Sequence, residues 1–137
     1  MTLSLRHVEL QHVHQTWPLI ESFIAAAQEH GGDDYTLDQV KMFVAQGQWL
    51  LVVAVDEKNK LHGAGTINFS NYPNDRIAFI TFIGGKLIAN KEVLAQLKTM
   101  LQKMGATKIQ AAVRPSMAKL LGRTGFKERY TIVETKI

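Results

Sequence analysis

The sequence contains no cysteine. Disulfides, thiolate zinc sites and cysteine nucleophiles are therefore excluded. It also has no internal repeat, low-complexity segment or linker. These absences point to an ordinary globular domain, and they are compatible with a reducing compartment.

Long apolar runs are missing as well. No stretch approaches the roughly 18 consecutive apolar residues that a membrane-spanning helix needs, and the first residues, MTLSLRHVELQHVH, do not resemble a signal peptide. We therefore expect a cytoplasmic protein.

Three common catalytic motifs are absent too. The chain has no Gly-x-x-x-x-Gly-Lys-Ser/Thr loop, no Gly-x-Gly-x-x-Gly turn and no Gly-x-Ser-x-Gly elbow. P-loop nucleotidases, dinucleotide-binding folds and α/β-hydrolases therefore have no support.

What is present fits one domain covering residues 1–137. The composition is 46% hydrophobic and 20% charged, as in typical soluble domains. The net charge is +4, which can favour anionic partners such as nucleic acid or a phosphorylated cofactor. The basic residues are scattered, with some local density between Arg114 and Arg129, so a solvated basic face is favoured over nucleic-acid binding.

The first part of the chain predicts one strand and two helices. Apolar and polar residues alternate over 3–8, as in a short strand. A helix is predicted from Trp17, with Pro18 in its first turn and an end near 31–32. Thr36 and Gln39 then form a capping-box pattern.

The rest of the chain predicts a sheet interrupted by helices. The apolar run 49–55 indicates a strand covered on both faces. The further expected strands are 61–69, 77–83, 108–113 and a last one over 125–136, with helices over 90–104 and 116–123. The resulting β-α-α-β-β-β-α-β-α-β order predicts an α/β (α+β) fold with a mixed sheet, antiparallel in the middle and parallel around the long helix.

This order resembles that of the GNAT superfamily of acyl-CoA N-acyltransferases. The segment from Arg114 to Phe126 has the length of a typical GNAT segment and its Gly-Phe ending, here Gly125-Phe126. The resemblance implies an Asn where this chain has Arg114, and a tyrosine acid where it has Leu121. Leucine cannot donate a proton, so the usual acid is missing.

The same resemblance implies a site for acetyl-CoA just before the long helix. GNAT proteins hold the pyrophosphate on a glycine-rich loop at a helix N-terminus. The matching stretch here has Gly84, Gly85 and Lys86 but no Gly-x-Gly at the helix start, and Glu92 would repel a phosphate. The expected cofactor-binding residues are Phe82, Ile83, Gly84, Gly85, Lys86, Asn90 and Arg114. A β-bulge or strand-ending turn is the competing interpretation of Gly84-Gly85-Lys86, and a structural arginine tied to a carboxylate is that of Arg114.

The chain is also similar to small GNAT-like proteins of tailed bacteriophages. The similarity rests on the Trp17-to-Glu21 motif, the strand start at 47–53, Ile83-Gly84-Gly85-Lys86, and Arg114-Pro115 followed by Gly125-Phe126. It implies a phage origin and the host cytoplasm as location.

Several other polar residues are weaker candidates. His62 is a possible base, although an exposed strand histidine is favoured, and Glu21 is more typical of a solvated helix position. Tyr72 and Tyr130 could donate protons, but Tyr130 is expected to be a half-buried strand residue. We expect no metal site at His7, His12 and His14, because Glu9 is the only acidic residue near them.

Two functions are compatible with these residues. The first is an acyl-CoA-dependent N-acyltransferase, in which a backbone N–H near Phe82 or Ile83 polarises the thioester carbonyl and water or another tyrosine replaces the missing acid. The second is a catalytically inactive GNAT-shaped protein that binds a protein partner. The sequence leaves the acceptor amine and the oligomeric state open.

Overall fold

A computed structural model describes residues 2–30, 34–87 and 90–137 of the chain. The strands are β1 (Ser4–His7), β2 (Leu50–Val55), β3 (Leu61–Asn71), β4 (Arg76–Gly85) and β5 (Lys108–Ala111). The helices are a 3₁₀ turn, η1 (Leu10–His12), and α1 (Val13–His30), α2 (Leu37–Ala45), α3 (Lys91–Lys103) and α4 (Pro115–Gly122).

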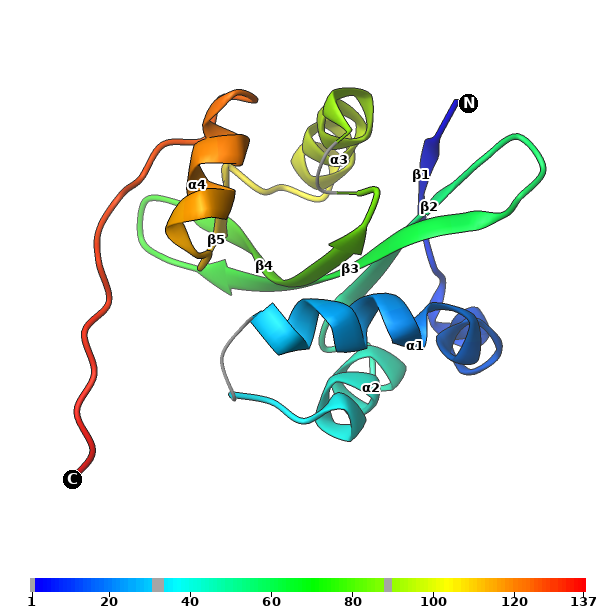
Figure 1. The fold of residues 1–137 in the computed structure, drawn as a ribbon, viewed down its shortest axis with the longest axis horizontal. Coiled ribbons are helices and arrows are strands. Elements are labelled where there is room, and N and C mark those ends of the chain that lie inside the picture. Colours follow the sequence, from blue (N-terminus) through cyan, green and yellow to red (C-terminus); the bar gives the residue numbers. More distant parts are fainter. Residues whose placement is uncertain (1, 31–33, 88–89) are drawn as a thin grey trace.

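The five strands form one sheet whose spatial order follows the chain, β1-β2-β3-β4-β5. The pairings of β1 with β2, β2 with β3 and β3 with β4 are antiparallel, and β5 lies parallel to β4 across α3. This arrangement confirms the predicted mixed sheet. In Figure 1, α1 and α2 cover one face of the sheet while α3 and α4 cover the other.

Each face of the sheet has its own hydrophobic core. The side chains of Val52, Ile67 and Ile80 pack with the buried face of α3, whereas those of Leu51, Val53 and Phe82 pack with α1 and α2. Alternate residues of β2 therefore serve opposite layers. This confirms that strand 49–55 is covered on both sides.

The helix ends follow local capping chemistry. At α2, the Thr36 side chain accepts a hydrogen bond from the Gln39 backbone N–H, and the Gln39 side chain accepts one from the Thr36 N–H. At α3, the Asn90 side chain accepts from the Val93 N–H, and Gly105 follows the helix with a φ of 90°. Both caps were predicted.

The first helix differs from the prediction. It begins at Val13 rather than near Trp17, so Pro18 lies inside it. Figure 1 shows the early turns of α1 at an angle to the later ones. A proline inside a helix removes a backbone hydrogen bond and bends the axis. The predicted helix end at 31–32 lies outside the described residues.

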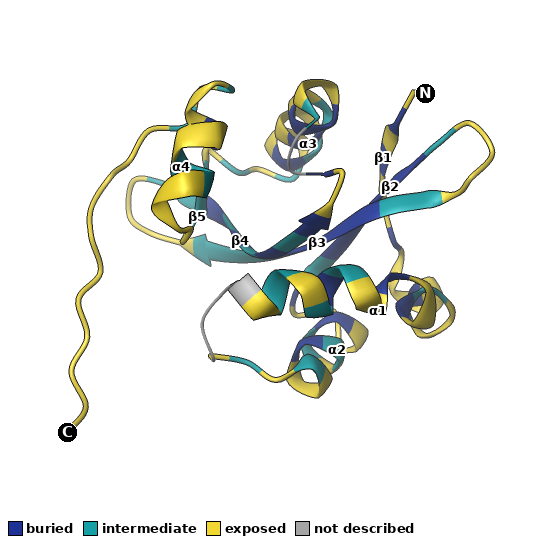
Figure 2. Cartoon of the chain, in the orientation of Figure 1, coloured by how far each residue is buried: buried dark blue, intermediate teal, exposed yellow. Residues whose placement is uncertain are grey.

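The predicted last strand, 125–136, is also wrong. The residues after Arg123 form no strand, and those from Lys127 onward are exposed throughout. Figure 2 shows this segment as an exposed chain that leaves α4 and runs away from the rest of the molecule. Residues such as Tyr130, Ile132 and Val133 favour a strand, but a strand also needs a neighbour to supply its hydrogen bonds.

Candidate functional site

The pairing between β4 and β5 covers only the first part of β4. The two strands pair from Ile77 and Lys108 to Ile80 and Ala111, where β5 ends. The strand β4 continues to Gly85, so its residues 81–85 have no β5 partner. A strand edge without a neighbour exposes backbone N–H and C=O groups that can bind an extended ligand.

A β-bulge at Thr81 coincides with the end of this pairing. In the register of β3 and β4, Thr66 faces Phe82 while Ile67 faces Ile80, which leaves Thr81 without a partner. The bulge also reverses the pleat, because Ile80 packs against the α3 layer and Phe82 against the α1 layer. An extra residue bends a strand and strengthens its twist, and here it directly follows the last β4 residue that pairs with β5.

The bulge is held by two threonine side chains. The hydroxyl oxygens of Thr66 and Thr81 lie 2.6 Å apart, and the Thr81 hydroxyl is 3.0 Å from the Thr66 carbonyl oxygen, which accepts its proton. Thr66 is the only fully buried polar residue among those that the structure describes. Sequence reasoning missed both residues, although a threonine within each of two apolar strands was a visible signal.

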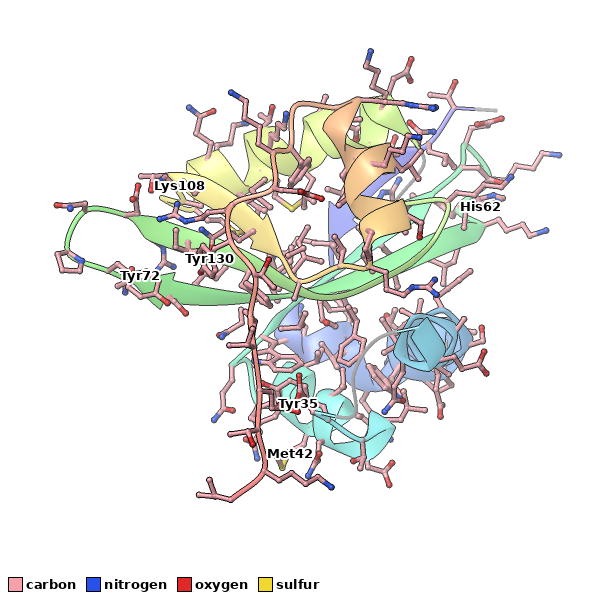
Figure 3. The ribbon with its side chains drawn as sticks, turned by 60° about the vertical axis from the view of Figure 1, so that its left-hand side comes forward. Tyr35, Met42, His62, Tyr72, Lys108 and Tyr130 are labelled. Atoms are coloured by element: carbon pink, nitrogen blue, oxygen red, sulfur yellow. The ribbon has the colours of Figure 1, made fainter. Side chains whose placement is uncertain are left out.

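The ring of Phe82 belongs to an aromatic cluster beside the unpaired part of β4. The ring of Tyr35 meets that of Phe82 edge-on, with centroids 6.4 Å apart, and lies 4.8 Å from that of Trp49. Phe43 stacks on Trp49 at 4.7 Å. Tyr35, labelled in Figure 3, precedes α2 and is partly exposed. Its sequence position gave no signal, because it stands alone in a polar loop.

The predicted residues Phe82, Ile83, Gly84 and Gly85 form the end of β4, and Lys86 lies in the turn that follows. The two glycines have packing roles there. A Cβ on Gly84 would overlap the backbone carbonyl oxygen of Phe23 in α1. Gly85 has a φ of 71° and lies against the His62 carbonyl oxygen, which accepts a hydrogen bond from the Lys86 N–H. The side chain of Lys86 is exposed.

The remaining predicted cofactor residues lie at the starts of two helices. Asn90 uses its side chain to cap α3. Arg114 precedes Pro115 at the start of α4, is exposed, and makes no side-chain cap there. Residues 88–89 of the predicted pyrophosphate loop lie outside the described residues. The unpaired β4 edge exposes backbone N–H and C=O groups to an extended ligand, and the exposed Lys86 carries a positive charge just after it.

Leu121 takes no part in proton chemistry. It lies on the inner side of α4, is only 7% exposed, and packs in the core of the α3 layer. The position that the resemblance gives to a tyrosine is thus filled by a core leucine.

His62 is better buried than the sequence suggested. Its side chain is 13% exposed and its Nε2 lies 2.9 Å from Asp56 Oδ2. Asp56 also accepts hydrogen bonds from the backbone N–H groups of Lys60 and Lys58. The His62 hydrogen bond, followed by these backbone contacts, lowers the pKa of the Asp56 carboxyl to about 2. The prediction of an exposed His62 is therefore wrong: its side chain pairs with Asp56, which lies in the turn between β2 and β3.

The other polar candidates lie at the surface. Glu21 is exposed, as are Tyr72 at 62% and Tyr130 at 69%. The expectation of a half-buried Tyr130 is wrong, because no strand forms around it.

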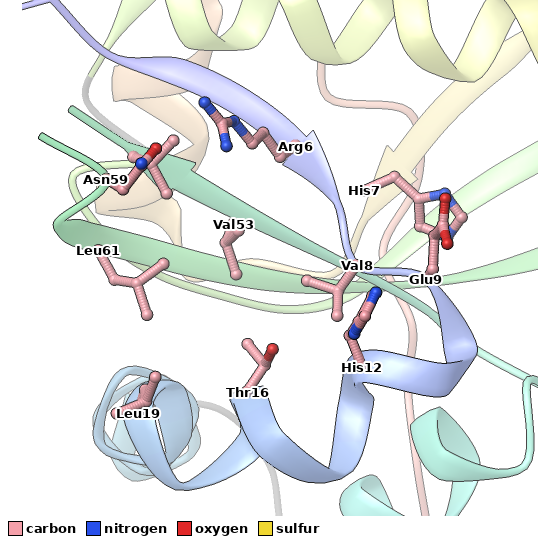
Figure 4. Close-up of a pocket in the computed structure, with 11 residues that line it drawn as sticks. Arg6, His7, Val8, Glu9, His12, Thr16, Leu19, Val53, Asn59 and Leu61 are labelled. Atoms are coloured by element: carbon pink, nitrogen blue, oxygen red, sulfur yellow. The ribbon is translucent and has the colours of Figure 1, made fainter. Parts of the chain in front are cut away.

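An open pocket lies elsewhere, between β1 and the start of α1. It has a volume of about 460 Å³, and its lining includes Arg6, His7, Glu9 and His12 but no residue of β4 or β5. Figure 4 shows these side chains around its rim. Within the described parts of the chain, no group of three or more His, Cys, Asp or Glu side chains is placed to hold a metal ion.

Comparison with known proteins gives the class of the fold. No protein-family model and no curated protein sequence matches the chain. Among solved structures, an aminoglycoside acetyltransferase from an uncultured soil metagenomic sample, in complex with trehalose, superposes with a TM-score of 0.71 at 12% identity, covering 98% of this chain and 95% of the other. For glucosamine-6-phosphate N-acetyltransferase from Arabidopsis thaliana the TM-score is 0.65 at 13% identity, with 99% of each chain covered.

A predicted acetyltransferase from Clostridium acetobutylicum, solved with acetyl-CoA, has a TM-score of 0.66 at 13% identity and covers 98% of this chain and 96% of its own. The chain therefore has the fold of the GNAT acetyltransferases. At these identities the likeness concerns the fold alone and gives no support for a phage origin. None of the helices that the structure describes combines the length and the apolar character that crossing a membrane requires.

Proposed function

We propose that the protein transfers an acyl group from acyl-CoA to an amine. The observation that carries this proposal is the end of the β4–β5 pairing at the Thr81 bulge, which leaves residues 81–85 of β4 without a β5 partner within a GNAT fold. Acetyl-CoA would supply the activated acyl group when bound. The residues that would hold it are Phe82 to Lys86 along the edge, with Asn90 and Arg114 beyond.

The chemistry asked of the chain is modest. The amine nitrogen forms a bond to the thioester carbonyl carbon, the carbon–sulfur bond breaks, coenzyme A leaves as the thiolate, and the amine proton passes to water. A backbone N–H near Phe82 or Ile83 polarises the carbonyl, because an unpaired strand edge leaves such donors free. Lys86 offers a positive charge to the phosphate end of the ligand.

We propose Tyr35 as the proton donor in place of Leu121. Of the chain's three tyrosines, Tyr72 and Tyr130 are highly exposed, whereas the ring of Tyr35 packs against Phe82 at the free edge. A phenol can protonate the leaving thiolate directly.

Ligand binding tests the proposal first. Acetyl-CoA at about 100 times its Kd should stabilise the fold by roughly 2.7 kcal/mol, and so raise the melting temperature by several degrees. ADP is the matched control, because it carries a pyrophosphate but no thioester arm. It shows how much of the stabilisation comes only from attraction between phosphate groups and a basic protein. A melting temperature that acetyl-CoA leaves unchanged, or that ADP raises equally, would contradict the proposal.

Replacing Tyr35 tests the assignment of the acid. Tyr35→Phe should lower kcat by about 10²-fold or more if the phenol transfers a proton, while the rise in melting temperature with acetyl-CoA remains. Tyr72→Phe serves as the control and should leave kcat unchanged. The measurement is the rate at which a panel of primary amines is acetylated, monitored through the release of the coenzyme A thiol. An unaltered kcat in Tyr35→Phe would refute the role of Tyr35 as the proton donor.

The second candidate is a GNAT-shaped binding protein without catalysis. The core position of Leu121 and the use of Gly84 for helix packing favour it. It predicts that no amine in the panel is acetylated, whether or not acetyl-CoA binds.

A further inference from the structure

A second β-bulge lies at the start of β3, next to the turn that joins it to β2. In the register of β2 and β3, Ala54 faces Gly63 and Val55 faces Leu61. His62 is the extra residue between these two pairs and has no partner in β2. Because a bulged residue is left out of the ladder of hydrogen bonds, the position of His62 depends on its other contacts.

The side chain of His62 supplies one of these contacts. Its Nε2 lies 2.9 Å from Asp56 Oδ2, and the two side chains are 13% and 12% exposed. The other carboxylate oxygen, Oδ1, accepts hydrogen bonds from the backbone N–H groups of Lys58 at 2.8 Å and Lys60 at 2.9 Å. Asp56 is therefore fixed in the turn by both oxygens, and it anchors His62 where a neighbouring strand does not.

The backbone of His62 holds the turn that follows β4. The Lys86 N–H donates to the His62 carbonyl oxygen at 2.8 Å, directly beyond the last paired residues of the two strands, Gly63 and Gly85. A Cβ on Gly85 would overlap that same carbonyl oxygen, so no side chain separates the two segments. A shift of the His62 backbone must therefore move Gly85 and Lys86 as well.

The residue after Lys86 is fixed too. Leu87 is fully buried in the core of the α3 layer, and a Cβ on Gly63 would lie only 3.0 Å from its backbone nitrogen. The side chain of Lys86 is exposed, and the ion pairs among the described residues involve Asp56 and Asp75 instead of this lysine. The turn thus presents a free positive charge from a backbone that is held on both sides.

We propose that His62, anchored by Asp56, is a positioning residue for the acyl donor: it fixes the turn that presents Lys86 to the phosphate groups of acyl-CoA. The inference rests on the proposed acyl transfer. His62 acts through its backbone carbonyl and Lys86, not on the reacting atoms. A charge that is already held in place costs less ordering when the ligand binds, so the anchor increases affinity for the donor.

Binding of acetyl-CoA tests the anchor. His62→Ala should weaken binding by about 10-fold, as expected for the loss of a hydrogen bond to a charged group. His62→Gln should restore most of the affinity, because the glutamine amide can still donate to Asp56. His14→Ala is the matched control, since His14 is exposed on α1, and should leave the Kd unchanged. Titration calorimetry measures each Kd, and circular dichroism confirms that each variant is folded.

Coupling to Lys86 separates positioning from a general loss of stability. Lys86→Ala removes the ammonium group and keeps the backbone N–H, so adding His62→Ala to it should weaken acetyl-CoA binding by no more than about 2-fold further. In turnover, His62→Ala should raise the KM for acetyl-CoA and leave kcat unchanged at saturation, because it alters binding of the donor and not the chemical step. A full 10-fold loss in the Lys86→Ala background would overturn the inference.

Hydrogen exchange at the Lys86 amide tests the turn without any ligand. In the free protein, His62→Ala should accelerate exchange of this amide with deuterium by about 10-fold, and His62→Gln should restore its protection. Equal protection of the amide in the wild type and His62→Ala would overturn this inference alone. A wild-type chain that does not bind acetyl-CoA would overturn the proposed function and, with it, the role of His62 toward the donor.

Discussion

The hydroxyl groups of Thr66 and Thr81 lie at the point where the pairing between β4 and β5 ends. Their contact is a polar interaction within the sheet. Thr66 is fully buried, so its hydroxyl has no water to replace a lost partner. The shape of the proposed site therefore depends on this pair of hydroxyl groups.

Thr81→Val should reduce the free energy of unfolding by about 1–3 kcal/mol, because it leaves the buried Thr66 hydroxyl unsatisfied. Adding Thr66→Val should recover part of this loss, since removing both partners costs less than removing one. Urea unfolding of the two single variants and the double variant measures the coupling. If the double variant is destabilised by the sum of the two single effects, the hydroxyl pair does not hold the bulge.

Asp56 gives the fold a defined dependence on acid. Its pKa in the folded state is about 2, below the ordinary value of 3.8, so the folded state favours the carboxylate. This stabilisation is complete above about pH 4 and is lost as the pH falls toward 2.

Asp56→Asn should therefore have a lower melting temperature than the wild type at about pH 5, and this difference should be smaller at about pH 2.5. The exposed Asp34 provides a control through Asp34→Asn, which should follow the wild-type curve. Thermal scans across this pH range make the measurement. A difference in melting temperature between wild type and Asp56→Asn that is the same at all pH values would show that the lowered pKa of Asp56 is not its cause.

At the scale of elements, Gly84 decides how closely α1 approaches β4. Gly84→Ala places a Cβ on the Phe23 carbonyl oxygen, so helix and strand must move apart at a cost of about 1–3 kcal/mol. Gly122→Ala is the matched control: nothing lies within 4 Å of its added Cβ, and alanine favours a helix by up to about 1 kcal/mol. Chemical denaturation should show opposite signs for the two changes, and equal effects would contradict this account.

The elements were predictable where their signals are local. The capping box at Thr36, the Asn90 cap and the apolar period of α3 each depend on neighbours within a few residues, and each was correctly located. The start of α1 was misplaced because Pro18 is normally a first-turn residue, and packing of Val13 and Trp17 in the core overrides this preference.

The candidate site was less accessible to sequence reasoning. The glycine pair at 84–85 was visible, but its contact with Phe23 depends on the fold of distant segments. The Thr81 bulge depends on the register between two strands, and Tyr35 approaches Phe82 only after α2 has folded. The missing last strand has the same cause, since a strand forms only where a neighbouring segment supplies its hydrogen bonds, and no such neighbour can be located from the sequence.

The sheet order has a consequence for how the protein is made. Because β2, β3 and β4 are neighbours both in the chain and in space, this meander can assemble on the ribosome as soon as Gly85 has emerged. The strand β5 must wait for α3, and β1 joins across the long helical insertion between it and β2. We expect amide hydrogens of the central meander to exchange last with deuterium, and those of β5 to exchange among the first in the sheet.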